Sequence, residues 1–193
     1  MGKDNPVMYI CRSINDSRSV IHVGAVGTNP RKQLQRHKRY KEATPHIIGF
    51  DYDRKLVNSA KRSGFAEIFV ADATNRKQMK NIINKYDTFR HVIATEVIEH
   101  IGNLTLFLDN MYLLLADNGS LYITTPDVTS VSAQAVLRGE TYPDGRPKMK
   151  VNPDHICWFD IQTLTTLLKR SNLKITKSTT LRNTLYVRAK RDG

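Results

Sequence analysis

The sequence predicts an α/β fold in which a doubly wound sheet is mostly parallel and ends in an antiparallel hairpin. Three observations lead to this prediction. An apolar stretch, 20–23, runs directly into Gly24 and Gly27, and Pro30 then fits the first turn of a helix, as in nucleotide-binding α/β domains. Strand-like and helix-like stretches then alternate along the chain. The last two strand-like stretches are too close for a parallel crossover, so they form a hairpin.

The elements of the first half follow from apolar runs and helix stop signals. The stretches 46–51 and 91–94 are short and apolar, which is typical of buried strands. The helix after the second strand carries its apolar residues on one face, and Gly64 fits its end. The predicted strands are 20–23, 46–51, 66–70, 91–94 and 120–124, and the predicted helices are 30–40, 53–64, 75–85 and 103–115.

The second half departs from this rhythm. Residues 126–153 form a long segment that contains Gly and Pro, with a short helix over 132–137. Long loops in compact domains are usually functional, so residues 126–158 are predicted to be a loop insertion that faces the acceptor, the molecule on which the protein would act. A helix over 159–170 and strands over 173–179 and 184–188 end the chain, whereas residues 1–19 are either irregular or a short helix.

Composition sets the class of protein. A chain of 193 residues with 40% hydrophobic content is predicted to be one domain, 1–193, with a substantial core. No apolar run is long enough to span a bilayer, and the polar residues 1–6 predict no signal peptide. Cys11 and Cys157 lie far apart, which predicts a reducing compartment, no disulfide framework and a cytoplasmic location.

The net charge of +12 is high for an enzyme that acts on a small molecule. It has two interpretations: a polyanionic partner such as RNA, or a solvated basic surface. The basic residues gather in the first predicted helix and at the end of the chain, 188–191.

Two carboxylates lie at the carboxyl ends of predicted strands. Asp51 ends the second strand, where a carboxylate accepts hydrogen bonds from the ribose of a nucleotide bound at the first turn, and Tyr52 can lie against an adenine ring. Asp72 follows the third strand, where it can accept from an adenine amino group while the Ala73 N–H pairs with a ring nitrogen. The alternative role for both carboxylates is a helix cap, although Asp53 is the better candidate beside Asp51.

The stretch after the fourth strand has the densest chemistry. If it is helical, Glu96, Glu99 and His100 share one face, where two carboxylates and an imidazole can bind a divalent cation or supply a general base. An ordinary polar face is the alternative. His155 lies beside the chain's one tryptophan, Trp158, after the long segment, and it can fold back over the same site.

The order of these motifs resembles that of class I S-adenosylmethionine-dependent methyltransferases, from Val20 to Arg188. The motifs are Val-Gly-Ala-Val-Gly-Thr, Gly-Phe-Asp-Tyr-Asp, Val-Ala-Asp-Ala and Thr-Glu-Val-Ile-Glu-His, followed by a terminal hairpin. The resemblance implies a Rossmann-like fold and S-adenosylmethionine as cofactor. With it come the expected cofactor-binding residues His22, Gly24, Ala25, Gly27, Asp51, Tyr52, Asp72, Ala73, Thr95 and Glu96.

The first turn departs from the family pattern. His22 stands where an acidic residue is usual, and Val26 and Thr28 stand where further glycines are usual. These departures leave a catalytically inactive cofactor- or nucleic-acid-binding module as one alternative. A dinucleotide-dependent oxidoreductase is disfavoured, because Pro30 stands in place of the third glycine and because the chain ends in a hairpin.

The Glu-x-x-Glu-His run is similar to that of the ubiquinone-type O-methyltransferases and of the small-RNA 3′-terminal 2′-O-methyltransferases. That likeness implies a divalent metal held by Glu96, Glu99, His100 and His155, although many class I members use no metal here. His100, His155 and Glu99 are the predicted catalytic residues. The expected reaction is O-methylation of a hydroxyl on a small metabolite or glycan precursor. The alternative is 2′-O-methylation of RNA with a divalent cation.

Overall fold

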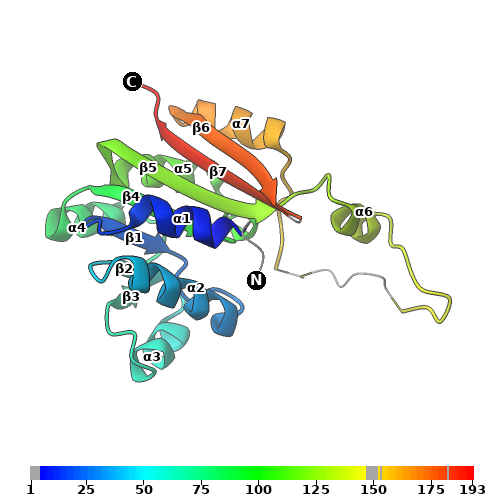
Figure 1. The fold of residues 1–193 in the computed structure, drawn as a ribbon, viewed down its shortest axis with the longest axis horizontal. Helices are drawn as coiled ribbons and strands as arrows, with labels where there is room; N and C mark the ends of the chain where they lie inside the picture. The colour runs from blue at the N-terminus through cyan, green and yellow to red at the C-terminus, as the bar shows by residue number, and fades with distance from the viewer. Residues whose placement is uncertain (1–4, 147–151, 153, 182) are drawn as a thin grey trace.

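A seven-stranded sheet forms the centre of the computed structural model, which describes residues 5–146, 152, 154–181 and 183–193 (Figure 1). The strand order is β3-β2-β1-β4-β5-β7-β6. The first five of these pair in parallel, and β7 is antiparallel to both β5 and β6. The strands are β1 (Val20–Val23), β2 (Ile48–Asp51), β3 (Ile68–Val70), β4 (Phe89–Thr95), β5 (Leu115–Pro126), β6 (Leu173–Leu181) and β7 (Thr184–Arg191). The predicted fold class is confirmed.

The helices begin at side chains that cap their free N–H groups. Each α-helix in the described ranges has an Asn, Asp or Ser at its N-cap that accepts such a bond, and Asp53 does so for α3, as predicted. The helices are α1 (Pro6–Ile14), α2 (Pro30–Ala43), α3 (Arg54–Arg62), α4 (Arg76–Tyr86), α5 (Leu104–Leu114), α6 (Val131–Leu137) and α7 (Ile161–Arg170), with a 3₁₀ turn, η1 (Ile98–His100).

Both faces of the sheet are covered, so β4 is buried along nearly its whole length. One face packs against α4, α5 and α7, and the other against α1 and α2. The amino-terminal stretch therefore contains a core helix, since Val7, Ile10 and Ile14 of α1 are buried against this second face. None of the helices within the described ranges combines the length and apolarity needed to cross a membrane.

Two sequence predictions of local structure were wrong. Residues 115–119 form the first part of β5, whereas the predicted helix included residue 115 and the predicted strand began at residue 120. The stretch after β4 is not an α-helix, because Glu96 has a φ of 55° and only the 3₁₀ turn follows. The short helix predicted over 132–137 is confirmed as α6, which lies away from the sheet in Figure 1, and residues 147–151 and 153 of the predicted loop 126–158 lie outside the described residues.

Gly49 in β2 generates a stability prediction. A Cβ at this position would lie 2.8 Å from Ala25 Cβ and 3.0 Å from His37 Cε1, so Gly49→Ala overpacks the core and should lower the free energy of unfolding by about 1–3 kcal/mol. Gly102→Ala is the matched control, because the nearest side-chain atom there, Ile156 Cδ1, is 3.9 Å away. Urea denaturation of both variants measures the difference, and equal stabilities would contradict the packing at Gly49.

Candidate functional site

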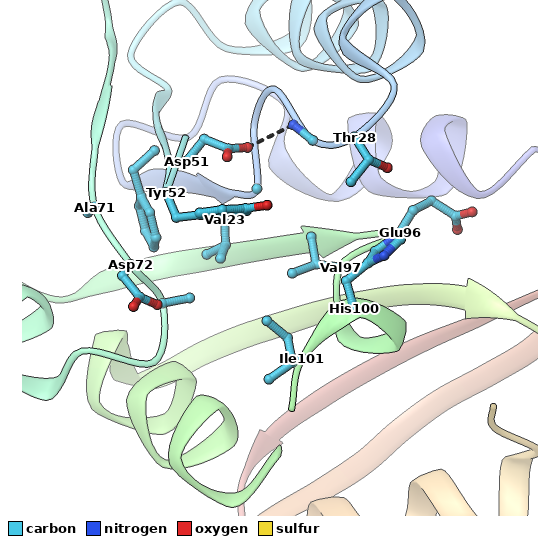
Figure 2. A pocket seen from close by; sticks show the side chains of 14 residues that line it. Val23, Thr28, Asp51, Tyr52, Ala71, Asp72, Glu96, Val97, His100 and Ile101 are labelled. Atoms are coloured by element: carbon cyan, nitrogen blue, oxygen red, sulfur yellow. Dashed lines mark hydrogen bonds between the residues drawn. The ribbon is translucent and has the colours of Figure 1, made fainter. Parts of the chain in front are cut away.

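A cavity of about 140 Å³ opens at the carboxyl ends of β1, β2, β3 and β4 (Figure 2). Parallel strands place their carboxyl ends at one edge of the sheet, which is where α/β proteins bind ligands. Tyr52 and Asp72 lie on one side of the cavity in Figure 2, and Thr28 and Glu96 lie on the other. The lining residues are Val23, Gly24, Gly27, Thr28, Phe50, Asp51, Tyr52, Ala71, Asp72, Ala73, Glu96, Val97, His100 and Ile101.

The glycine turn forms one wall of this cavity because it follows a path that few other residues allow. Gly24 and Gly27 have φ values of +66° and +62°. A Cβ on Gly24 would lie only 2.5 Å from Val97 Cγ2, so a side chain there would collide with the residue opposite. The two glycines are therefore required by the shape of the turn itself.

Asp51 holds this turn in place. One carboxylate oxygen, Oδ2, accepts hydrogen bonds from the backbone N–H groups of Val26 at 3.1 Å and of Gly27 at 2.7 Å, the second of which is drawn in Figure 2. The other, Oδ1, accepts from Asp53 N at 3.3 Å. Asp51 is only 3% exposed, yet it lines the cavity. The sequence predicted that Asp51 binds the ribose of a nucleotide, and it gave no sign that Asp51 also holds the glycine turn.

The residues expected near an adenine ring lie around the same opening. Tyr52 is 71% exposed and lines the cavity. Asp72 Oδ1 accepts hydrogen bonds from the backbone N–H and hydroxyl of Thr74, which fixes that carboxylate. The Ala73 carbonyl accepts from Asn110 Nδ2, and the Ala73 N–H has no acceptor within the described residues. A hydrogen-bond donor therefore remains at the cavity wall.

Three residues predicted to bind the cofactor lie beneath the wall rather than in it. His22, Ala25 and Thr95 are buried, and none of them lines the cavity. Gln33, which sequence reasoning missed, supports the turn from the same side: its Nε2 donates to the carbonyls of Gly24 at 2.9 Å and Thr95 at 2.6 Å. A glutamine in a polar, basic helix gave no sequence signal of burial.

The substituted position His22 belongs to a buried hydrogen-bond chain whose proton positions follow from its ends. His37 Nε2 lies 3.3 Å from Glu67 Oε1, and the pKa of Glu67 is lowered, because the Lys41 ammonium outweighs the opposing effect of burial. An ionised carboxylate only accepts, so His37 Nε2 carries the proton and neutral His37 accepts at Nδ1. His22 Nδ1, 3.0 Å away, is then the donor, and His22 Nε2 accepts from the Thr95 hydroxyl at 3.2 Å.

The imidazoles of His22 and His37, the two in this hydrogen-bond chain, are held neutral. Burial lowers the pKa of His22 well below its usual value, and the repulsion that His22 would meet from a protonated His37 and from Arg36 lowers it further. Burial also lowers the pKa of His37, against the attraction of Glu67. This row of hydrogen bonds thus connects Thr95, at the end of β4, to Glu67 without placing a charge on either histidine.

A second cavity, of about 170 Å³, shares part of its wall with the first. Gly27, Thr28, Glu96 and His100 line both cavities. The second is the more polar in its residues, which include Asn29, Lys32, Gln33, Arg36, Glu99, Asn152 and His155.

Glu99 is the most unusual group in this second cavity. It is 1% exposed, and neither carboxylate oxygen has a hydrogen-bond partner within the described part of the chain. Burial and then the charge of Glu96 raise the pKa of Glu99 to about 8, which favours the protonated form at neutral pH. A buried carboxyl group without partners is costly, so this group fits one that meets a cation or a ligand donor.

His155 is brought to Glu99 and His100 by main-chain hydrogen bonds. The backbone N–H groups of Ile156 and Cys157 both donate to the Glu99 carbonyl, at 2.9 and 3.1 Å. His100 Nδ1 lies 2.8 Å from the Asp154 carbonyl, and since a carbonyl only accepts, Nδ1 carries the proton and Nε2 keeps its lone pair. The His100 and His155 rings lie 4.8 Å apart between centroids.

The structure therefore gathers three of the four predicted metal ligands. One ligand atom from each of Glu99, His100 and His155 lies within 4.8 Å of the others. Glu96, the fourth predicted ligand, is not part of this group: its Oε1 accepts from the Thr124 hydroxyl at 2.8 Å, and its Oε2 is 4.0 Å from Arg36. The positive φ of Glu96 breaks the helical spacing that would have placed Glu96 on one face with Glu99 and His100.

Comparison with known proteins gives a consistent family. The profile described as a methyltransferase domain matches residues 26–178. The mitochondrial ubiquinone biosynthesis O-methyltransferase of Rattus norvegicus is 44% identical over 46 residues, which cover 24% of this chain and 13% of that protein. The mouse protein of the same name is 41% identical over 46 residues, covering 24% of this chain and 12% of that protein.

Solved structures share the fold at low sequence identity. A SAM-dependent methyltransferase from Archaeoglobus fulgidus aligns with a TM-score of 0.64 at 15% identity, over 96% of this chain and 94% of that one. The mitomycin 7-O-methyltransferase MmcR aligns with a TM-score of 0.63 at 12% identity, over 96% of this chain and 53% of that one. These likenesses show the fold.

The buried histidine chain predicts how stability depends on pH. The pKa of His22 is lower in the folded chain than the ordinary value of about 6.5, so between pH 7 and 5 the unfolded chain binds a proton that the folded chain excludes. The free energy of unfolding should therefore fall on acidification, and His22→Asn should reduce this slope by up to about 1.4 kcal/mol per pH unit.

Urea denaturation at several pH values measures this slope. His46→Asn is a control, because His46 is exposed and outside the chain of hydrogen bonds. If His22→Asn left the slope as in the wild type, His22 would not be the neutral, buried group described above.

Proposed function

We propose that this chain, which belongs to the methyltransferase domain family and uses S-adenosylmethionine, transfers the methyl group of that cofactor to a hydroxyl group of its acceptor. The observation that carries the proposal is the position of Glu99, His100 and His155 beside the cavity at the glycine turn. A hydroxyl acceptor must lose a proton when it is methylated, and these side chains offer a place for it.

The first cavity has the features that the cofactor requires. The glycine turn lets the backbone approach a ligand closely. The free Ala73 N–H and the Asp72 carboxylate offer one donor and one acceptor to an adenine edge, and Tyr52 offers a flat exposed ring. We assign the ribose to Asp51, whose Oδ1 accepts, from the described residues, only the 3.3 Å bond from Asp53 N. His22, Ala25 and Thr95 then act by supporting the turn.

His100 would face both the cofactor and the acceptor, because its imidazole is one of the groups that line both cavities. Bound S-adenosylmethionine supplies a methyl group on a sulfonium that leaves as a neutral thioether. The protein's task is to align the acceptor oxygen with that methyl group and to receive the hydroxyl proton. His100 Nε2 is suited to receive it, because the Asp154 carbonyl holds the other ring nitrogen in its protonated form. Burial, and then the repulsion that a protonated His100 would exert, lower the pKa of His155, which favours the neutral form of that ring.

We propose a small hydroxylated molecule, such as a metabolite or glycan precursor, as the acceptor. The relative from rat is named as an O-methyltransferase of ubiquinone biosynthesis and the structural neighbour MmcR as a mitomycin 7-O-methyltransferase, which supports this class. The acceptor would enter beside Asn152 and His155, which belong to the predicted loop 126–158 and line the second cavity.

Replacing His100 by Ala should separate proton removal from cofactor binding. We expect turnover to fall by about 10²–10⁴-fold, as for loss of a general base, with S-adenosylmethionine affinity nearly unchanged. Transfer of labelled methyl groups to a panel of phenols, sugar hydroxyls and RNA 3′ ends measures turnover, and calorimetry measures affinity. His46→Ala is the matched control. A collapse of cofactor binding in His100→Ala would assign this residue to the cofactor or the fold.

A second candidate is RNA 2′-O-methylation with a divalent cation, and the buried, unpartnered carboxyl of Glu99 favours it. Two imidazoles and a carboxylate are suitable ligands for a divalent cation. A histidine that binds a metal usually donates its other ring N–H to a carbonyl or carboxylate, as His100 Nδ1 does to the Asp154 carbonyl. Glu99, His100 and His155 would hold the ion, and a bound ion would lower the pKa of the acceptor hydroxyl. The net charge of +12 is compatible with RNA.

Thermal unfolding with added Mn²⁺ or Zn²⁺ tests the ion directly. A site that binds only the folded chain adds about 2.7 kcal/mol at a hundredfold excess over Kd, and Glu99→Gln should abolish this gain whereas Glu96→Gln should keep it. Equal responses of the two variants would contradict the three-residue site. Without metal, Glu99→Gln should become the more stable protein as pH rises from 5 to 8, because the raised pKa of Glu99 makes the folded wild type lose stability over that range.

A further inference from the structure

A separate cavity of about 650 Å³ opens at the other edge of the sheet, at the amino ends of β1 and β4. His91 lies near the start of β4, and Thr95 at its end marks the cofactor edge. His91 and Thr95 are four residue-to-residue steps apart along the extended strand, or about 13 Å. This cavity takes no part in the site described above.

Three arginines from different parts of the chain line this cavity. Arg18 precedes β1, Arg90 lies in β4 and Arg188 in β7. Within the described residues, none of the three forms an ion pair with a carboxylate. Asp16 is the one acidic residue in the lining, and its carboxylate accepts from Asn15 Nδ2. The cavity therefore carries an excess of positive charge.

The guanidinium of Arg188 is positioned with its terminal nitrogens free. Its Nε donates to the Ser120 hydroxyl at 3.1 Å, and its carbon lies 5.8 Å from the centre of the Tyr122 ring. Within the described chain the two terminal nitrogens donate to no other group. The hydroxyl of Ser120 keeps its own hydrogen for a ligand, since it accepts from Arg188.

His91 in the cavity wall reports on the convergence of these charges. Burial and then the positive charges of Arg188 and Arg90 lower the pKa of His91 to about 4. Both arginines are therefore near enough to act on one buried imidazole, and they line the same cavity as that imidazole. Close like charges without a counterion are unfavourable, and a bound anion relieves that repulsion.

We propose that this cavity binds a phosphate-bearing anion through Arg18, Arg90 and Arg188. A guanidinium group forms paired hydrogen bonds with two phosphate oxygens. Three guanidinium groups around one cavity can therefore bind several oxygens of a phosphate-bearing anion. The volume is within the range of cavities that hold small ligands. The ligand is either a free phosphate ester or the backbone of RNA, which share this chemistry.

Calorimetric titration with pyrophosphate tests the site. We expect the wild type to bind it, and Arg18→Gln/Arg90→Gln and Arg90→Gln/Arg188→Gln to bind it at least about tenfold more weakly, because each variant loses two charged donors. The first variant changes two exposed side chains only, so it remains informative if loss of Arg188 disturbs the sheet. Arg62→Gln/Arg170→Gln, exposed and outside the cavity, is the control with the same change of net charge.

S-adenosylmethionine affinity should stay at the wild-type value in Arg18→Gln/Arg90→Gln, since the cofactor cavity is at the opposite edge. An RNA oligonucleotide titrated into the same variants identifies the source: a parallel loss of RNA affinity indicates a polynucleotide backbone, and loss of pyrophosphate affinity alone indicates a free ester. Absence of pyrophosphate binding, or an equal loss in the Arg62→Gln/Arg170→Gln control, would overturn the proposal.

Discussion

The carboxylate of Asp51 is the contact on which the cofactor site depends. The parallel register of β1 and β2 pairs Val23 with Phe50, so the residues that follow, Gly24 and Asp51, come to lie beside each other. From there, Asp51 satisfies two N–H groups of a turn that has two residues at positive φ. A hydrogen bond to a charged acceptor is worth more than one between neutral groups, and a turn without it would leave amides of the buried wall unpaired. The shape of the cavity follows from this one carboxylate.

The same edge of the sheet also carries the chemistry, because its loops fold back on one another. The Glu99 carbonyl accepts from two consecutive amides of the segment after the long loop, which fixes His155 against the Glu99–His100 turn. His100 then lies between two cavities of different polarity. Under the proposed function, the methyl donor and the acceptor would each occupy one of these cavities and would meet at the wall that the cavities share.

The positive charge of the chain is distributed between different functions. Arg191 is structural, since its guanidinium bonds to Asp117 and to the carbonyls of Tyr112 and Leu115. Arg36 lies by the acceptor cavity, where it approaches Glu96. Arg188, from the same basic end of the chain as Arg191, faces instead a cavity at the opposite edge of the sheet. A count of charges therefore does not say which surface a basic residue serves, because neighbours on a strand point to opposite faces.

Sequence alone determined the fold class, the glycine turn and the acidic residues that follow β2 and β3, because apolar period and strand-to-helix order are local properties of the chain. It also indicated Glu99, His100 and His155 as one group. Only the tertiary structure decided that Glu96 lies outside this group, that Gln33 supports the turn, that His37 bonds to His22, and that α1 belongs to the core. These outcomes rest on a single positive φ and on contacts between residues far apart in the chain, and neither leaves a pattern in the order of residue types.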